Sequence, residues 1–188
     1  MNTTIKTGLA ILMLAISCKK ESNPIRSSTV AQSTEKALRF TIGQRYGGGI
    51  IFYIDSTGQH GLIADTADLK TSKWGNGLPR TLTEAKGTKI GSGYSNTKKI
   101  ILAQGDSGTY AARRCWHDQG SGYRDWFLPS KDELNELFKQ QSVVGIDING
   151  RYWSSSEINI YRVWCQTANG QGYNLKRTKN NVRAIRTF

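Results

Sequence analysis

The stretch "YRDWFLPSKDELNELF", residues 123–138, changes from a strand pattern to a helix pattern at Pro129. Ser130 and Glu133 have the Ser-x-x-Glu spacing of a capping box, in which the serine hydroxyl and the glutamate carboxylate each accept a backbone amide of the other residue. Three apolar residues follow at helical spacing: Leu134, Leu137 and Phe138. The stretch therefore predicts a strand that leads into a capped helix with one buried face.

The residues before this stretch predict a hairpin and then long loops. "IIFYI" is typical of a buried strand, and the turn "DSTGQHG" separates it from "LIAD", so residues 50–64 predict a hairpin. The glycines at 47–49 are not followed by the lysine of a phosphate loop, and they indicate a bulge or a close backbone approach. Residues 65–98 show little periodicity and are expected to be long loops that carry Trp74.

Residues 96–119, "NTKKIILAQGDSGTYAARRCWHDQ", predict a helix in two pieces. Candidate caps are Asn96 for the first piece and either Asp106 or Ser107 for the second. Four residues of the second piece fall near one face, which is expected to pack inward: Ala111, Ala112, Cys115 and Trp116.

The last third of the chain predicts strands. Their sequences are "RYWSSSE", "YRVWCQTA", "GYNLKRT" and "NVRAIRTF". Gly170 and Gly172 predict a turn between the middle two, and "NVRAIRTF" is interpreted as one closing strand.

The first residues indicate the compartment. Residues 1–17 have the layout of a signal peptide, since Lys6 precedes a short apolar run from Leu9 to Ile16 that is too short to span a bilayer. Cys18 follows directly, as in a bacterial lipoprotein, whose cysteine sulfur carries a diacylglycerol. An ordinary secreted protein with a cysteine near the cleavage point is the alternative. Residues 18–36 are polar and predict a disordered tether, so the folded domain is expected at 37–188.

The net charge of +12 favours anionic partners. Because the signal peptide places the domain outside the cytoplasm, nucleic acid is not the expected partner, and the charge points to a membrane surface or an acidic glycan. Lys19 and Lys20 leave the inner and the outer membrane as alternatives, with the outer membrane or cell surface favoured.

Several segments together resemble one family, the Lcl C-terminal domain family, which was long described as a domain of unknown function. The segments are "YGGGIIFYIDSTGQHGLIA", "AARRCWHD", "GYRDWFLPSKDELNELF", "YWSSSE" and "VRAIRTF", within residues 40–188. The resemblance implies an α+β, C-type-lectin-like fold with small twisted antiparallel sheets, two helices and long loops. It also implies a surface-protein role, because the founding adhesin domain is associated with sulfated polysaccharides. The calcium-dependent sugar motifs of true C-type lectins do not occur here, so no metal and no other cofactor is expected.

The late strands carry aromatic and cationic residues suited to an anionic sugar chain, because aromatic faces stack on sugar rings and Arg or Lys pairs with sulfate or carboxylate. The candidate ligand-binding residues are Tyr161, Arg162, Trp164, Tyr173, Asn174, Lys176 and Arg177, with Lys179 beside them. Strand alternation puts about half of them on one face. The alternative is that Trp164 and Tyr161 belong to the core and that the cations only solvate an edge strand.

No catalytic constellation is expected. Residues 154–156 are serines followed by Glu157, but they lack a nucleophile elbow, and His117 is distant in sequence. Cys115 and Cys165 could form a disulfide outside the cytoplasm, or remain two buried thiols.

The sequence thus predicts a lipid-anchored, non-enzymatic binding or adhesion module of the cell envelope that recognises an anionic glycan or another surface polymer. A structural or assembly lipoprotein that contacts other envelope proteins is the second hypothesis, and an enzyme is the third.

Overall fold

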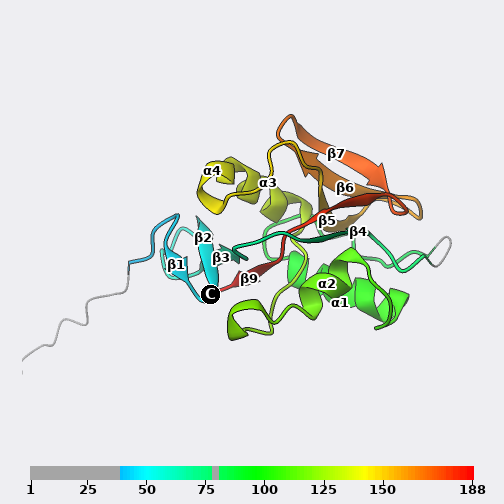
Figure 1. The fold of residues 1–188 in the computed structure, drawn as a ribbon, viewed down its shortest axis with the longest axis horizontal. Helices are drawn as coiled ribbons and strands as arrows, with labels where there is room; N and C mark the ends of the chain where they lie inside the picture. The colour runs from blue at the N-terminus through cyan, green and yellow to red at the C-terminus, as the bar shows by residue number, and fades with distance from the viewer. Residues whose placement is uncertain (1–38, 78–80) are drawn as a thin grey trace, which may run out of the picture. The chain divides into compact units, whose positions relative to one another are not determined.

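Two small β-sheets and four α-helices make up the described part of the chain, residues 39–77 and 81–188 of a computed structural model (Figure 1). The predicted signal peptide, Cys18 and the tether lie outside the described residues. The elements are β1 Arg45–Tyr46, β2 Gly49–Ile54, β3 Gly61–Ala64, β4 Leu69–Lys73, α1 Gly93–Gln104, α2 Ala111–Trp116, the 3₁₀ turn η1 Gly120–Gly122, α3 Lys131–Lys139, α4 Gln141–Val144, β5 Tyr152–Glu157, β6 Arg162–Thr167, β7 Gly170–Leu175, β8 Lys179–Val182 and β9 Ile185–Thr187. The predicted α+β class is confirmed. The resemblance implied two helices, whereas the described residues form four, of which only α4 was not predicted from the sequence pattern.

The smaller sheet has the strand order β1-β2-β3-β9, and its centre is the predicted hairpin. β2 and β3 pair antiparallel with Ile51 opposite Ile63, which confirms the hairpin over residues 50–64. The interpretation of the glycine cluster as a close backbone approach is also confirmed. A Cβ on Gly49 would collide with the carbonyl oxygen of Ala64, so only glycine fits there.

The larger sheet has the strand order β4-β8-β5-β6-β7. It is mixed rather than purely antiparallel, because β5 and β8 run parallel where Tyr152 meets Asn181. The prediction of long loops over 65–98 is wrong at both ends, since β4 occupies Leu69–Lys73 and α1 begins at Gly93. The sequence pattern did not predict β4, because this edge strand has no buried apolar side chain and its only buried residue is the polar Ser72.

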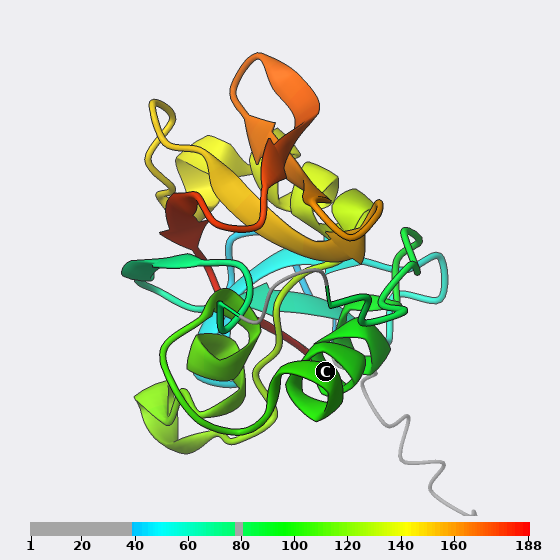
Figure 2. The ribbon, with the colours of Figure 1, turned by 90° about the vertical axis from the view of Figure 1, so that its right-hand side faces the viewer.

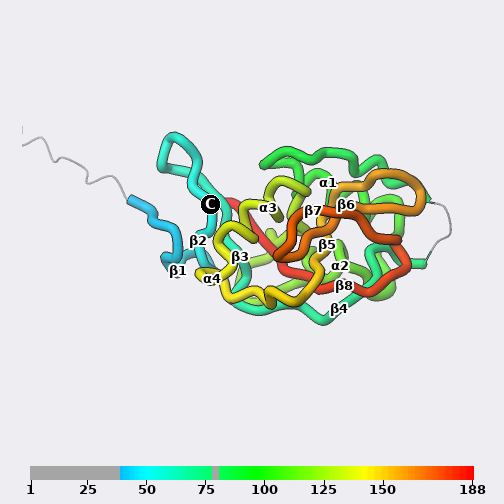
Figure 3. Tube along the Cα trace, turned by 90° about the horizontal axis from the view of Figure 1, so that it is seen from above, coloured from blue at the N-terminus to red at the C-terminus, as the bar shows by residue number. Residues whose placement is uncertain are grey.

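The C-terminal segment belongs to both sheets. The prediction of one closing strand over "NVRAIRTF" is wrong, because β8 ends at Val182 in the larger sheet and β9 begins at Ile185 in the smaller one. Figure 3 shows this red segment running from one sheet into the other. At the far end, the Phe188 ring packs edge-on against Phe40, with 4.6 Å between ring centroids. The two ends of the described domain therefore pack against each other.

Helices cover both faces of the larger sheet (Figure 2). α1 and α2 lie on the side where Trp153 points and share an apolar cluster with it. α3 lies on the side of the adjacent Tyr152, whose cluster includes Leu134, Leu137 and Phe138. Neighbouring residues of a strand point to opposite faces, so β5 separates two cores.

The helix ends confirm one predicted cap and correct the others. Ser130 and Glu133 form the complete capping box of α3. The two-piece helix is confirmed, but Asn96 lies inside α1, where its side chain bonds to the backbone of Gly87, and α2 begins after Tyr110 rather than after Asp106 or Ser107. On α2, Ala111, Ala112 and Cys115 are buried as predicted, whereas Trp116 is only partly buried.

Candidate functional site

The β6–β7 hairpin carries most of the predicted ligand-binding residues on its two strands. The strands pair in register without a bulge, and Trp164 stands directly opposite Tyr173. Val163 and Cys165 on the same strand point into the core, so Trp164 and Arg162 occupy the outer face. Tyr173 is 54% exposed.

Each aromatic ring of this outer face has a cation stacked on it. The Arg162 guanidinium lies 4.6 Å from the centroid of the Tyr173 ring, and the Lys131 amine lies 4.8 Å from the centroid of the Trp164 ring. We call Arg162, Trp164, Tyr173 and Lys131 the β6–β7 platform. Such pairs hold flat rings and positive charges side by side on an accessible surface.

Lys131 was not among the sequence candidates. It reaches the platform because the first residue of α3 is tied to the sheet: its backbone amide donates to the Ser156 hydroxyl, and its carbonyl accepts from the Gln171 side chain. The capping box shows that Lys131 is the first residue of α3. Its position next to Trp164 depends on contacts with Ser156 and Gln171, which are distant in sequence, so no local pattern could predict it.

Two sequence candidates are structural instead. Lys176 turns inward and forms a buried ion pair with Glu157, and its amine also donates to the carbonyl of Thr81. Asn174 points to the same side and donates to Asn180. Both side chains therefore point away from the outer face of the hairpin and make contacts within the protein, because Asn174 and Lys176 alternate with Tyr173 along the chain. Tyr161 and Arg177 are exposed in the turns next to β6 and β7.

The serine-rich strand serves the fold. The hydroxyl of Ser154 donates to the Trp164 carbonyl, and the hydroxyl of Ser156 donates to the Gly87 carbonyl. Glu157 accepts from the backbone amides of Thr83 and Glu84. His117 lies elsewhere, 2.6 Å from a carboxylate oxygen of Asp106, whose pKa it holds below the usual range. The structure therefore does not join these residues into one site.

Cys115 and Cys165, for which a disulfide and two free thiols were the alternatives, are not bonded to each other. Cys115 and Cys165 are both free and buried, in the same apolar cluster under α2 and β6, so the second of the two expected arrangements holds. Burial raises the pKa of both thiols, which keeps them protonated and unreactive.

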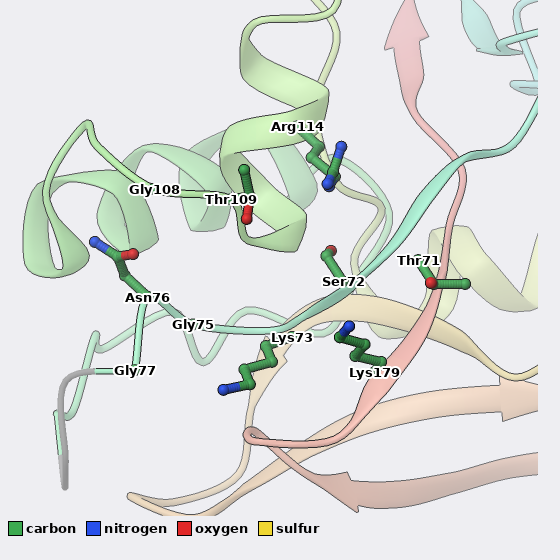
Figure 4. Close-up of a pocket in the computed structure, with 10 residues that line it drawn as sticks. All are labelled: Thr71, Ser72, Lys73, Gly75, Asn76, Gly77, Gly108, Thr109, Arg114 and Lys179. Carbon is green, nitrogen blue, oxygen red and sulfur yellow. The ribbon is translucent and has the colours of Figure 1, made fainter.

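A polar pocket of about 360 Å³ lies between β4 and α2, and sequence analysis did not find it (Figure 4). Its charged lining residues are all cations: Lys73, Arg114 and Lys179. No carboxylate occurs among the described residues that line it. Figure 4 shows Ser72, Thr109 and Arg114 directed into the space between β4 and α2, whereas Lys73 and Lys179 extend from the other side of β4.

No family model matches this chain, and no curated protein matches it. Its fold is similar to that of a fimbrial protein from Bacteroides ovatus ATCC 8483. The two chains are 15% identical with a TM-score of 0.53, over 73% of this chain and 43% of the fimbrial protein. This chain therefore corresponds to less than half of that protein, and the similarity concerns the fold.

Two further properties hold for the described residues alone. None of their helices is long and apolar enough to cross a membrane. No group of three or more His, Cys, Asp or Glu side chains among them is arranged to hold a metal ion.

Proposed function

We propose that this chain is a non-enzymatic recognition module, displayed on the cell envelope by a lipid at Cys18, that binds an anionic glycan or another anionic surface polymer. The observation that carries the proposal is the β6–β7 platform, on which aromatic rings alternate with cations. The fold similarity to a fimbrial protein is consistent with display at the cell surface. Membership of the Lcl C-terminal domain family and a C-type-lectin-like fold are part of the same proposal.

The platform suits a sugar chain for two physical reasons. Trp164 and Tyr173 present adjacent flat rings, which match the apolar faces of successive sugars. Arg162 lies over the Tyr173 ring and Lys131 over the Trp164 ring, so a sugar that contacts the remaining surface of these rings has a cation nearby for its acidic substituents, and a guanidinium can pair with them bidentately. The hairpin is held on its inner face by Val163 and Cys165 in the core, so the platform is rigid before a ligand arrives.

The platform predicts specific losses of binding. Trp164→Ala and Tyr173→Ala should each weaken binding to heparin or another sulfated polysaccharide about fivefold to tenfold, because each removes one stacking surface. Affinity should also fall with added salt. Titration of the purified chain on a glycan array with heparin competition, at two salt concentrations, measures both effects.

Tyr94→Ala is the matched control, since Tyr94 is an exposed tyrosine on α1, outside the platform. Its binding should equal that of the unmodified protein. If all three variants bind alike, the platform is not the ligand surface.

Display on the envelope has its own test. We expect labelled palmitate to be incorporated into the protein in cells and the Cys18→Ala variant to lose both the label and its membrane association. A variant that keeps the label, or a protein found inside the cell with its first 17 residues uncut, contradicts the lipid anchor.

A second function, contact with another envelope protein, is favoured by one feature. A mostly apolar groove of about 560 Å³ lies between α1 and α2, lined by Tyr94, Leu102 and Trp116, and Leu102 is 87% exposed. Exposed apolar surface of this kind is typical of protein contacts. Co-purification of an envelope protein that is lost on Leu102→Asp, together with no binding on the glycan array, would favour this function over the first.

A further inference from the structure

Two hydrogen-bond donors that line the pocket between β4 and α2 are buried without an acceptor among the described residues. They are the Ser72 hydroxyl and the Arg114 Nε. Ser72 is 3% exposed. Buried donors in folded proteins nearly always have an acceptor. Two unpaired donors that line one pocket therefore indicate an acceptor-rich ligand.

None of the three cations that line the pocket forms an ion pair with another described residue. Lys73 and Lys179 stand directly opposite each other in the β4–β8 ladder, and like charges in that position destabilise a sheet. The guanidinium of Arg114 makes no hydrogen bond to another described residue. An anion at this edge of β4 would reduce both costs, since it would attract Arg114 directly and the two lysines at longer range.

The walls of the pocket are fixed in place. The loop that continues β4 is held by the end of α1, because the Asn76 backbone amide donates to the Gln104 side chain and the Asn76 side chain donates to the Gln104 carbonyl. Gly108 lies so close to Asn76 that a Cβ there would collide with its side chain. The pocket therefore keeps its shape without a ligand, which favours binding.

We infer that this pocket binds a phosphate monoester. Three cations without a neighbouring carboxylate in the lining match a dianion better than a singly charged sulfate ester or carboxylate, which would leave more positive charge uncompensated. The tetrahedral oxygens can accept from Ser72 on the β4 side and from Arg114 on the α2 side at the same time. The ligand class that we infer is the phosphorylated sugars of an envelope polymer. This choice of polymer rests on the proposed recognition function.

The test uses a pair of monosaccharides that differ only in the ester. Glucose 6-phosphate should bind at pH 8 about fivefold more tightly than glucose 6-sulfate, as measured by isothermal titration calorimetry. This preference should fall to about twofold or less at pH 5.5, because most of the phosphate then carries one charge, whereas sulfate keeps one charge throughout. The sulfate titration also reports any effect of pH on the protein itself. This control is needed because a second pocket, which shares Arg114 with the first, is lined by Asp68 and Asp118.

Variants locate the binding site. Arg114→Gln and Lys179→Gln should each weaken binding of glucose 6-phosphate about tenfold. Ser72→Ala should weaken it about threefold without lowering the stability of the fold, because the hydroxyl has no hydrogen-bond partner in the described part of the chain. Arg124→Gln, an exposed arginine outside the pocket, is the control and should bind normally.

Each contrary result overturns the inference. These results are equal affinity for the two esters at pH 8, no binding of either at millimolar concentration, or normal binding by Arg114→Gln and Lys179→Gln. The proposed function fails separately: if the glycan array shows no polymer bound while glucose 6-phosphate binds as expected, the pocket stands and the recognition of polymers does not.

Discussion

Replacing Glu157 with alanine is expected to lower the free energy of unfolding by about 3–5 kcal/mol. The Glu157 side chain is completely buried, forms an ion pair with Lys176 and accepts the backbone amides of Thr83 and Glu84. Its removal leaves the Lys176 ammonium, which is 13% exposed, without a counter-ion, and leaves two amides without an acceptor. Urea unfolding followed by circular dichroism measures the loss.

Companion variants separate the charge from the hydrogen bonds. Glu157→Gln keeps an acceptor for the amides and should cost less than alanine, and adding Lys176→Met to it should recover part of the loss because no buried charge then remains unpaired. Glu84→Ala is the matched control, since Glu84 pairs with Lys86 at the exposed surface and should change stability by no more than about 0.5 kcal/mol. A loss below 1 kcal/mol for Glu157→Ala would contradict this account.

The second large effect is a dependence of stability on pH that originates at Asp65. Asp65 is 7% exposed, and burial of its carboxyl, followed by the neighbouring carboxyl of Asp118, raises its pKa to about 6. The folded state therefore binds a proton more tightly than the unfolded chain, whose carboxyl has a pKa near 3.8. Stability contributed by the protonated form is present below about pH 4, is lost as pH rises toward 6, and is absent above it.

Asp65→Asn removes this dependence. The variant should match the unmodified protein near pH 4 and should be more stable at pH 8 by about 2–3 kcal/mol, because it has no charge to bury. Asp125→Asn is a control of opposite sign: the pKa of Asp125 is lowered by its hydrogen bond to Arg186, so this variant should lose stability at neutral pH. Thermal unfolding across pH 4–8 measures both. An Asp65→Asn variant less stable than the parent at pH 8 would refute the assignment.

Elements whose determinants lie within a few residues were predictable from sequence. The capping box of α3 needs only Ser130 and Glu133, and the β2–β3 hairpin needs two apolar runs and one turn. In both cases local hydrogen bonding and periodicity agree with the final packing, so the patterns were sufficient.

Elements that depend on distant partners were not predictable. α1 begins at Gly93 because the Glu133 carboxylate, from α3, accepts the backbone amides of Gly91 and Gly93. Ser92 stands at the N-cap position of that helix but makes no capping hydrogen bond with its side chain, and Asn96 was the wrong candidate. β4 likewise depends on pairing with β8, more than 100 residues later.

The candidate binding residues also differ in how far sequence alone could identify them. The β6–β7 hairpin was a candidate from sequence because aromatic and cationic residues recur along it. Which of these residues share a face could not be assigned, and the structure shows that Asn174 and Lys176 point inward. The pocket between β4 and α2 combines residues 71–77, 108–114 and 179, so no local pattern marks it.

The passage of β8 into β9 has a mechanical consequence. A load applied between an anchored N-terminal end and a ligand gripped on β6–β7 would enter the domain near Phe40, which is held by Phe188. It would then act on the β3–β9 ladder, where Leu62, Ile63 and Ala64 pair with Thr187, Arg186 and Ile185. Because Val182 and Ile185 anchor the same short segment in different cores, tension passes from one sheet to the other through covalent bonds rather than through a loop that can extend.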